Sequence, residues 1–277
     1  MKIVRVFPRR TRATPNDDLS FVGSPTLFAE ADRVHVSVTF TWDIARAEHL
    51  AEEWKYVAPV EIGGPAVGTK GGDFEPGKYL KPGYVITSRG CPNKCWFCSV
   101  WTRDGNIREL PITEGWNLLD DNLLACSEEH IRAVFQMLSR QPHQIELTGG
   151  LEAARLKNWH VRAISRLNLK QAFFAYDTPD DYEPLLCATE LLKEYELLPS
   201  PGHKIRCYVL IGFSGDTIEK AEKRLRSIFV LGITPMAMLW RNDSGKTDLA
   251  WRRFQRQWAR PAIIYGRGHD TRMEVTK

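Results

Sequence analysis

From residue 84 onward the chain repeats one pattern, in which a short apolar, β-favouring run is followed by a longer segment with helical spacing of its apolar positions. Such a succession is typical of βα units and predicts a parallel sheet. The sequence predicts six strands here, at 84–88, 116–120, 144–148, 171–177, 205–213 and 235–240. It predicts helices at 128–140, 158–167, 181–197, 216–231 and 248–259.

The first 80 residues carry a shorter version of this pattern. Residues 33–40 alternate apolar and polar positions as a half-buried strand does, residues 43–57 have helical periodicity, and residues 60–68 form an apolar run that ends in glycines. We therefore expect a small Rossmann-like βαβ segment within residues 1–80. The glycine- and proline-rich stretch GGDFEPGKYLKPG then marks a linker.

Composition narrows the class of protein only slightly. A chain of 277 residues with 43% hydrophobic residues can bury a full core, and its net charge of +4 permits an anionic partner without requiring one. There is no run of about 18 apolar residues, and the N-terminus lacks the apolar block of a signal peptide. We expect a soluble cytoplasmic protein with no membrane partner.

Three of the six cysteines, Cys91, Cys95 and Cys98, lie close together. A structural zinc site usually takes four ligands, often as two Cys-x-x-Cys knuckles, and no second knuckle follows. A disulfide fits poorly with a reducing compartment. Thiolates also hold iron–sulfur clusters, which normally take four cysteines. Three thiolates would leave one iron open to a substrate or cofactor.

The order Cys-x-x-x-Cys-x-x-Cys, with Phe97 directly before the last cysteine, resembles the signature of the radical S-adenosylmethionine (radical SAM) superfamily. The resemblance implies a 4Fe-4S cluster whose open iron chelates SAM. It implies reductive cleavage of SAM to a 5'-deoxyadenosyl radical that abstracts hydrogen from a substrate. It also implies a partial (β/α)6 TIM barrel, which six strands would fit, and an external electron donor of the flavodoxin or ferredoxin type.

The segment TSRG before the first cysteine resembles the corresponding segment in one branch of the superfamily. Members of that branch often carry a cobalamin-binding domain. On this resemblance the chain divides into an N-terminal α/β region (1–80), a partial barrel (81–245) and a basic C-terminal helix and tail (246–277). The N-terminal region is shorter than the full cobalamin domain and lacks its ligand pattern Asp-x-His-x-x-Gly. His35 and His49 have no such context, so we interpret them as structural or solvated and do not expect cobalamin.

The resemblance also implies SAM contacts in the loops that follow the strands, where parallel barrels build their sites. Phe97 and Gly212 would meet the adenine, Glu152 and Asp177 the ribose, and Arg155 the carboxylate. The ammonium group would meet one of the residues Asp120, Asp121 and Asn122. Local structure offers another interpretation of some of these residues. Asp120, Asp121 and Asn122 also suit a helix cap or turn, and Asp177 suits an Asx turn.

Both ends of the chain are basic. Read as a helix, residues 248–259 place Trp251, Phe254 and Trp258 on one face and most of the arginines on the others. A core-facing aromatic stripe with a solvated basic face explains this pattern, and so does a surface for the phosphates of RNA or of a substrate. Nucleic acid and a phosphate-bearing substrate therefore stay open as partners.

Two other functions also stay open. A SAM-dependent polar alkyl or methyl transferase on the same fold would release S-adenosylhomocysteine or methylthioadenosine. A non-catalytic iron–sulfur regulator would bind nucleic acid and leave SAM intact. The substrate is not identified, and Cys126, Cys187, Cys207 and Tyr208 are equal alternatives as a hydrogen donor. Cys126, Cys187 and Cys207 stand in apolar segments of the sequence, which is typical of buried thiols.

Overall fold

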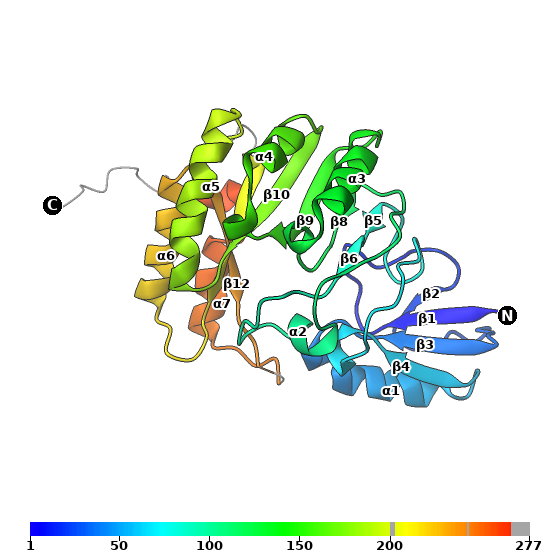
Figure 1. Cartoon of the computed structure of the whole chain (residues 1–277). Helices are drawn as coiled ribbons and strands as arrows, with labels where there is room; N and C mark the ends of the chain where they lie inside the picture. The colour runs from blue at the N-terminus through cyan, green and yellow to red at the C-terminus, as the bar shows by residue number, and fades with distance from the viewer. Residues whose placement is uncertain (200–202, 243, 267–277) are drawn as a thin grey trace. The chain divides into compact units, whose positions relative to one another are not determined.

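The computed structural model describes residues 1–199, 203–242 and 244–266, and the chain forms two compact units (Figure 1). The first unit comprises residues 1–141 with 244–245, and the second comprises the other described residues. This partition by contacts differs from the three predicted domains, whose limits stay a prediction. Each unit is a mixed helix and strand structure in which most strands pair in parallel.

The N-terminal part of the first unit is a four-stranded parallel sheet in the order β2-β1-β3-β4. Its elements are β1 (Ile3–Phe7), β2 (Ser20–Val22), β3 (Arg33–Ser37), α1 (Ile44–Trp54) and β4 (Val60–Gly63). The βαβ segment predicted for this region is confirmed as β3, α1 and β4. The prediction missed β1 and β2, which extend the sheet on the side of β3 away from β4.

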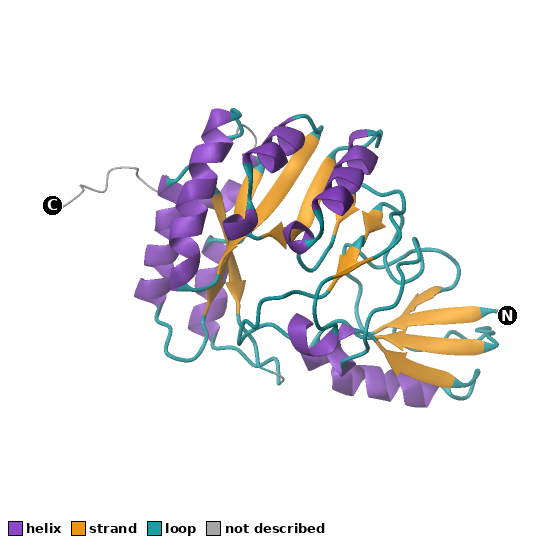
Figure 2. Ribbon diagram, viewed as in Figure 1, coloured by secondary structure: helices purple, strands orange, loops and turns teal. Residues whose placement is uncertain are grey.

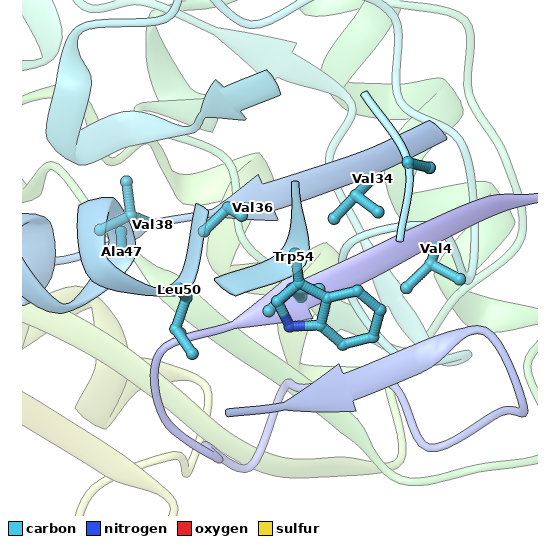
Figure 3. Packing of buried hydrophobic residues seen from close by; sticks show 9 residues of the cluster. Val4, Val34, Val36, Val38, Ala47, Leu50 and Trp54 are labelled. Atoms are coloured by element: carbon cyan, nitrogen blue, oxygen red, sulfur yellow. The ribbon is translucent and has the colours of Figure 1, made fainter. Parts of the chain in front are cut away.

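This sheet packs on α1 through a closed apolar cluster (Figure 3). Val34 and Val36 of β3 are fully buried, Val4 of β1 is 1% exposed, and the Trp54 side chain lies against them. The indole of Trp54 donates to the carbonyl oxygen of Gly23 at 3.0 Å, so its one polar atom is satisfied. The sheet thus has a core of its own, which holds the ends of its strands in place.

The rest of the first unit consists of short elements around the clustered cysteines. β5 pairs with β8 in parallel, and β6 pairs with β7 antiparallel. The predicted strands at 84–88 and 116–120 are present but shorter than predicted, while β7 and α2 were not predicted. The bounds are β5 (Tyr84–Val85), β6 (Ser88–Arg89), α2 (Val100–Arg103), β7 (Arg108–Glu109), β8 (Asn117–Leu118) and α3 (Glu128–Ser139).

The second unit alternates strands and helices, as the sequence pattern predicts (Figure 2). Its strands pair in parallel in the order β12-β11-β10-β9. Helix α5 packs on β10, α6 packs on β11 and β12, and α7 packs on β12. The bounds are β9 (Ile145–Leu151), α4 (Asn158–Ser165), β10 (Leu169–Tyr176), α5 (Tyr182–Glu194), β11 (Ile205–Ile211), α6 (Ile218–Val230), β12 (Thr234–Leu239), α7 (Leu249–Gln257) and α8 (Pro261–Gly266).

Single turns of 3-10 helix connect several of these elements. They are η1 (Thr41–Asp43), η2 (Pro65–Val67), η3 (Leu123–Ala125), η4 (Ala153–Arg155) and η5 (Pro179–Asp181). In the described part of the chain, no helix has both the length and the apolar character needed to cross a membrane.

The aromatic stripe at α7 faces the core, as the first of the two interpretations predicts. Phe254 and Trp258 are 6% and 1% exposed. Arg252, Arg253 and Arg256 are exposed on the other faces. The aromatic side chains therefore contribute to packing, and phosphate binding by the arginines stays a prediction.

Candidate functional site

The three clustered cysteines lie on one loop of the first unit, between β6 and α2, which we call the cysteine loop (residues 90–99). All three cysteines are partly buried. The N–H of Cys98 donates to the carbonyl oxygen of Cys95 at 3.1 Å, and the N–H of Cys91 donates to that of Gly105 at 3.0 Å. The loop is therefore held by a turn of its own and by the segment after α2.

Asp120 ties the end of β8 to the segment that leads into the cysteine loop. Its carboxylate accepts hydrogen bonds from the N–H of Thr87 (2.6 Å), the hydroxyl of Thr87 (2.6 Å) and the hydroxyl of Ser88 (2.7 Å). Asp120 is 2% exposed. Burial raises the pKa of this carboxyl, and the donors from Thr87 and Ser88 lower it. Because both oxygens are engaged inside the unit, the observed role of Asp120 is that of a loop anchor.

The next two residues hold the loop itself. Asp121 accepts from the N–H of Gly90 at 2.9 Å, and its other oxygen lies 3.6 Å from the guanidinium of Arg103. The side-chain amide of Asn122 donates to the sulfur of Cys91 at 3.3 Å. The three consecutive residues predicted as ammonium contacts thus all point toward residues 87–91. An ammonium contact by any of them stays a prediction.

The thiol of Cys98 lies close to other ionisable groups. Burial raises its pKa, and the neighbouring Cys91 and Asp121 raise it further. A thiol with a raised pKa is protonated at neutral pH, so metal binding to it would release a proton. Across residues 1–199, 203–242 and 244–266, no group of three or more His, Cys, Asp or Glu side chains is gathered around a position for a metal ion.

Aromatic side chains flank the cysteines. Phe97 is partly buried and meets Trp96 edge to face, with ring centroids 5.4 Å apart. Trp96 is 59% exposed. The indole N–H of Trp101 donates to the carbonyl oxygen of Cys95 at 3.1 Å. Phe97 was predicted as a site residue, whereas Trp96 and Trp101 were not, although their positions beside the cysteines were a signal for them.

In the second unit, Glu152 and Arg155 follow β9 and pair with each other. Their side chains are 2.7 Å apart, with 22% and 41% of their surfaces exposed. A partly exposed ion pair of this kind stabilises a protein by at most about 1 kcal/mol. The pair therefore holds the loop only weakly, and the predicted ribose and carboxylate contacts stay predictions.

Gly212 ends β11 in the left-handed region, with φ +74°. Its N–H donates to Asp216 at 2.9 Å, and Asp216 pairs with Arg224 at 2.7 Å. A Cβ added at Gly212 would lie 2.5 Å from Leu239 and 3.2 Å from Trp251. Glycine is required here by backbone conformation and by the approach of these two side chains. The predicted contact of Gly212 with an adenine ring stays a prediction.

Asp177 follows β10 in a partly buried position. Asp181, rather than Asp177, caps the turn there, since it accepts from the N–H groups of Asp177 (2.9 Å) and Thr178 (2.7 Å). The Asx-turn interpretation of Asp177 is therefore wrong. Burial raises the pKa of Asp177 to about 7, the nearby Asp181 raises it too, and a hydrogen bond from Leu210 lowers it.

This carboxyl predicts a dependence of stability on pH. The folded state holds the proton of Asp177 more tightly than the unfolded state does, so stability falls as pH rises from about 4 to about 7. An Asp177→Asn variant is expected to gain roughly 2–3 kcal/mol relative to the wild type between pH 5 and pH 8. Urea unfolding at the two pH values measures this change. The control is Asp180→Asn, an exposed neighbour, and equal pH profiles for wild type and Asp177→Asn would contradict the prediction.

The cysteines outside the loop differ from one another. Cys207 is fully buried, Cys126 is partly buried with a pKa raised to about 11 by burial, and Cys187 is exposed. The expectation of a buried thiol is confirmed for Cys207 and wrong for Cys187. Tyr208 faces away from Cys207 along β11, stacks on Phe173 with centroids 4.3 Å apart, and donates to the carbonyl oxygen of Thr148 at 3.2 Å.

The two histidines of the N-terminal region both have local partners. Nδ1 of His35 lies 2.7 Å from the hydroxyl of Tyr79, and Nε2 of His35 lies 3.8 Å from Glu61. His49 lies 3.3 Å from Glu53 on the surface of α1. These contacts agree with the structural or solvated interpretation of the two side chains.

Comparison with known proteins adds no relative. No protein-family model matches the chain, and no curated protein matches it. The resemblance to radical SAM proteins therefore rests on the residues of the cysteine loop and the pattern around them.

Proposed function

We propose that this chain is a radical SAM enzyme that cleaves SAM reductively at a 4Fe-4S cluster and begins its reaction by taking a hydrogen atom from its substrate. The observation that carries the proposal is the cysteine loop, in which Cys91, Cys95 and Cys98 follow β5, the first strand of the βα pattern, and the short strand β6. Loops at the carboxyl ends of parallel strands build the sites of βα barrels. The finer fold, a partial (β/α)6 barrel, belongs to this proposal, and so does a cytoplasmic location.

The donor set suits a cluster better than a single ion. A structural zinc ion usually takes four protein ligands, whereas the cysteine loop offers three thiolates. A 4Fe-4S cluster held by three thiolates keeps one iron open for a cofactor. All three thiols are partly buried, which limits the access of water to a bound cluster.

The bound cluster would supply an open iron for SAM and the electron that an external flavodoxin- or ferredoxin-type donor delivers. The residues of the chain position and tune the ligands. Asn122 donates to the sulfur of Cys91, and a hydrogen bond to a thiolate ligand stabilises its negative charge. Asp120 and Asp121 hold the residues before Cys91. Phe97 is the proposed adenine contact on the same loop.

Anaerobic reconstitution tests the proposal directly. The chain is loaded with iron and sulfide, SAM and dithionite are added, and the nucleosides are separated by chromatography. We expect 5'-deoxyadenosine. S-adenosylhomocysteine or methylthioadenosine in its place would favour the polar transferase. A loaded protein that shows no affinity for SAM in an equilibrium binding assay would contradict the proposal and favour the regulatory protein.

A further inference from the structure

The first unit contains a cavity of about 440 Å³ whose lining does not include the three clustered cysteines. It opens beside the last residue of β3 and the glycines that end β4, under the glycine-rich segment of residues 69–75. Arg89 and Asp121 form another side of the cavity. Arg89 directly precedes the cysteine loop, and Asp121 accepts a hydrogen bond from Gly90 of that loop. Small-molecule sites typically have volumes of about 300–1,000 Å³, so the size suits a small organic ligand.

A second hollow of about 310 Å³ lies next to the first, since the two share Ser37, Tyr79 and Leu80. It includes Phe7, the last residue of β1. Both hollows therefore lie at the carboxyl edge of the N-terminal sheet. In open parallel sheets, ligands bind at this edge, where the strand order reverses. In the order β2-β1-β3-β4 that point lies between β1 and β3.

The lining of the cavity contains a cation, Arg89, with one buried donor that lacks a partner within the described part of the chain. Nε of Arg89 is buried and, among the residues that the structure describes, has no hydrogen-bond partner. The guanidinium lies against Gly71, where an added Cβ would come within 2.8 Å of Nε. An unsatisfied buried donor costs about 1–3 kcal/mol, and more when it is charged. A ligand oxyanion in the cavity would pair with the positive charge of the guanidinium.

The other charged groups of the lining are already paired or lie in solvent. Arg103 pairs with Asp104 at 2.6 Å, and Lys78 pairs with Glu75 at 2.8 Å. Burial raises the pKa of Asp121, and the positive charge of Arg89 lowers it. Asp121 also accepts a hydrogen bond from the N–H of Gly90 and lies 3.6 Å from the guanidinium of Arg103. The acidic side chains Glu61 and Asp73 are exposed at the rim. Arg89 is therefore the cation of the cavity that we expect to pair with a ligand.

The wall beside Arg89 is apolar. Val36 is fully buried, Ile86 is 5% exposed, and Phe74 and Leu80 are partly buried. A ring or short hydrocarbon body would lie against these side chains and be removed from water. An acidic head at Arg89 and an apolar body are thus both accommodated.

We propose that this cavity binds a small organic anion, whose carboxylate or phosphate group is held by Arg89 and whose apolar body lies against Phe74, Leu80 and Ile86. Arginine offers a planar fork of donors that matches both groups. The inference does not depend on the cluster, because all of these residues belong to the apoprotein. If the proposed function also holds, the anion is its candidate substrate, since Arg89 lies two residues before Cys91.

The test measures binding by calorimetry to the full-length chain without iron, using acids and neutral molecules of the same shape. The pairs are adenosine 5'-monophosphate and adenosine, phenyl phosphate and phenol, and benzoate and benzyl alcohol. We expect at least one of the acids to bind. The affinity of its neutral counterpart is expected to be lower by about 10-fold or more, because the neutral molecule lacks one charge-assisted hydrogen bond. A phosphate or a carboxylate preference shows which oxyanion the site takes.

Variants locate the binding. Arg89→Met is expected to weaken the acid by about 10-fold or more, and Ser37→Trp is expected to block the cavity while leaving Arg89 in place. The matched control is Arg252→Met, which removes an exposed positive charge of α7. Circular dichroism checks that each variant is folded. The proposal is overturned if no acid binds the wild type, or if Arg89→Met and Ser37→Trp both bind it unchanged. Neither result bears on SAM cleavage, which is measured separately.

Discussion

A Cys95→Ala variant is expected to retain little iron after anaerobic reconstitution and to form no detectable 5'-deoxyadenosine from SAM. Cys95 is the middle one of the three thiols on the cysteine loop, and iron–sulfur clusters are held by thiolates. With one thiolate removed, a second iron loses its protein ligand, and a cluster bound at only two positions exchanges with solvent. Iron per chain and the nucleoside product are measured on the same preparation.

The matched control for this experiment is Cys187→Ala. Cys187 is an exposed thiol of α5 in the second unit, so its removal tests whether any accessible cysteine contributes iron ligands. The control is expected to retain iron and activity. Equal iron loss in both variants would mean that iron binds to thiols nonspecifically. Full iron content and full 5'-deoxyadenosine formation by Cys95→Ala would rule out the cysteine loop as the site.

An Asp120→Ala variant is expected to lose about 3 kcal/mol or more of unfolding free energy, because three buried donors lose their acceptor and each unsatisfied donor costs about 1–3 kcal/mol. Alanine leaves the N–H and hydroxyl of Thr87 and the hydroxyl of Ser88 without their acceptor in a buried place. Urea unfolding of the apoprotein, followed by circular dichroism, measures the change. Reconstitution of the same variant is expected to yield less iron, because the anchored segment leads directly into the cysteine loop.

Asp73→Ala is the control for the loss of a carboxylate from the first unit. Asp73 is exposed, so its removal is expected to change stability by less than about 0.5 kcal/mol. An Asp120→Asn variant keeps the shape and one acceptor oxygen, and its stability should fall between those of the wild type and Asp120→Ala. If Asp120→Ala were as stable as Asp73→Ala, the hydrogen bonds to Thr87 and Ser88 would have no role in holding the loop.

The longer helices and most strands were predictable because their patterns are local, whereas the short helices α2 and α8 were not predicted. Apolar spacing alone predicted α3 and α5 to within a few residues and located every strand of the second unit. The missed elements depend on partners elsewhere in the chain. β2 has only three residues and exists through its pairing with β1, and β6 pairs with β7 across the cysteine loop. Such short strands have little periodicity of their own, so tertiary pairing defines them.

By itself, the sequence determined the βα pattern and the cysteine spacing, because both depend on residues that are neighbours along the chain. Only the tertiary structure decided what the polar residues contact. Asp120 meets Thr87 across 33 positions, and Gly212 is crowded by Leu239 and Trp251 from later elements. The cavity at Arg89 likewise needs the ends of separate strands at one edge. Burial, hydrogen bonding and charge at these places arise from three-dimensional proximity, which local periodicity does not encode.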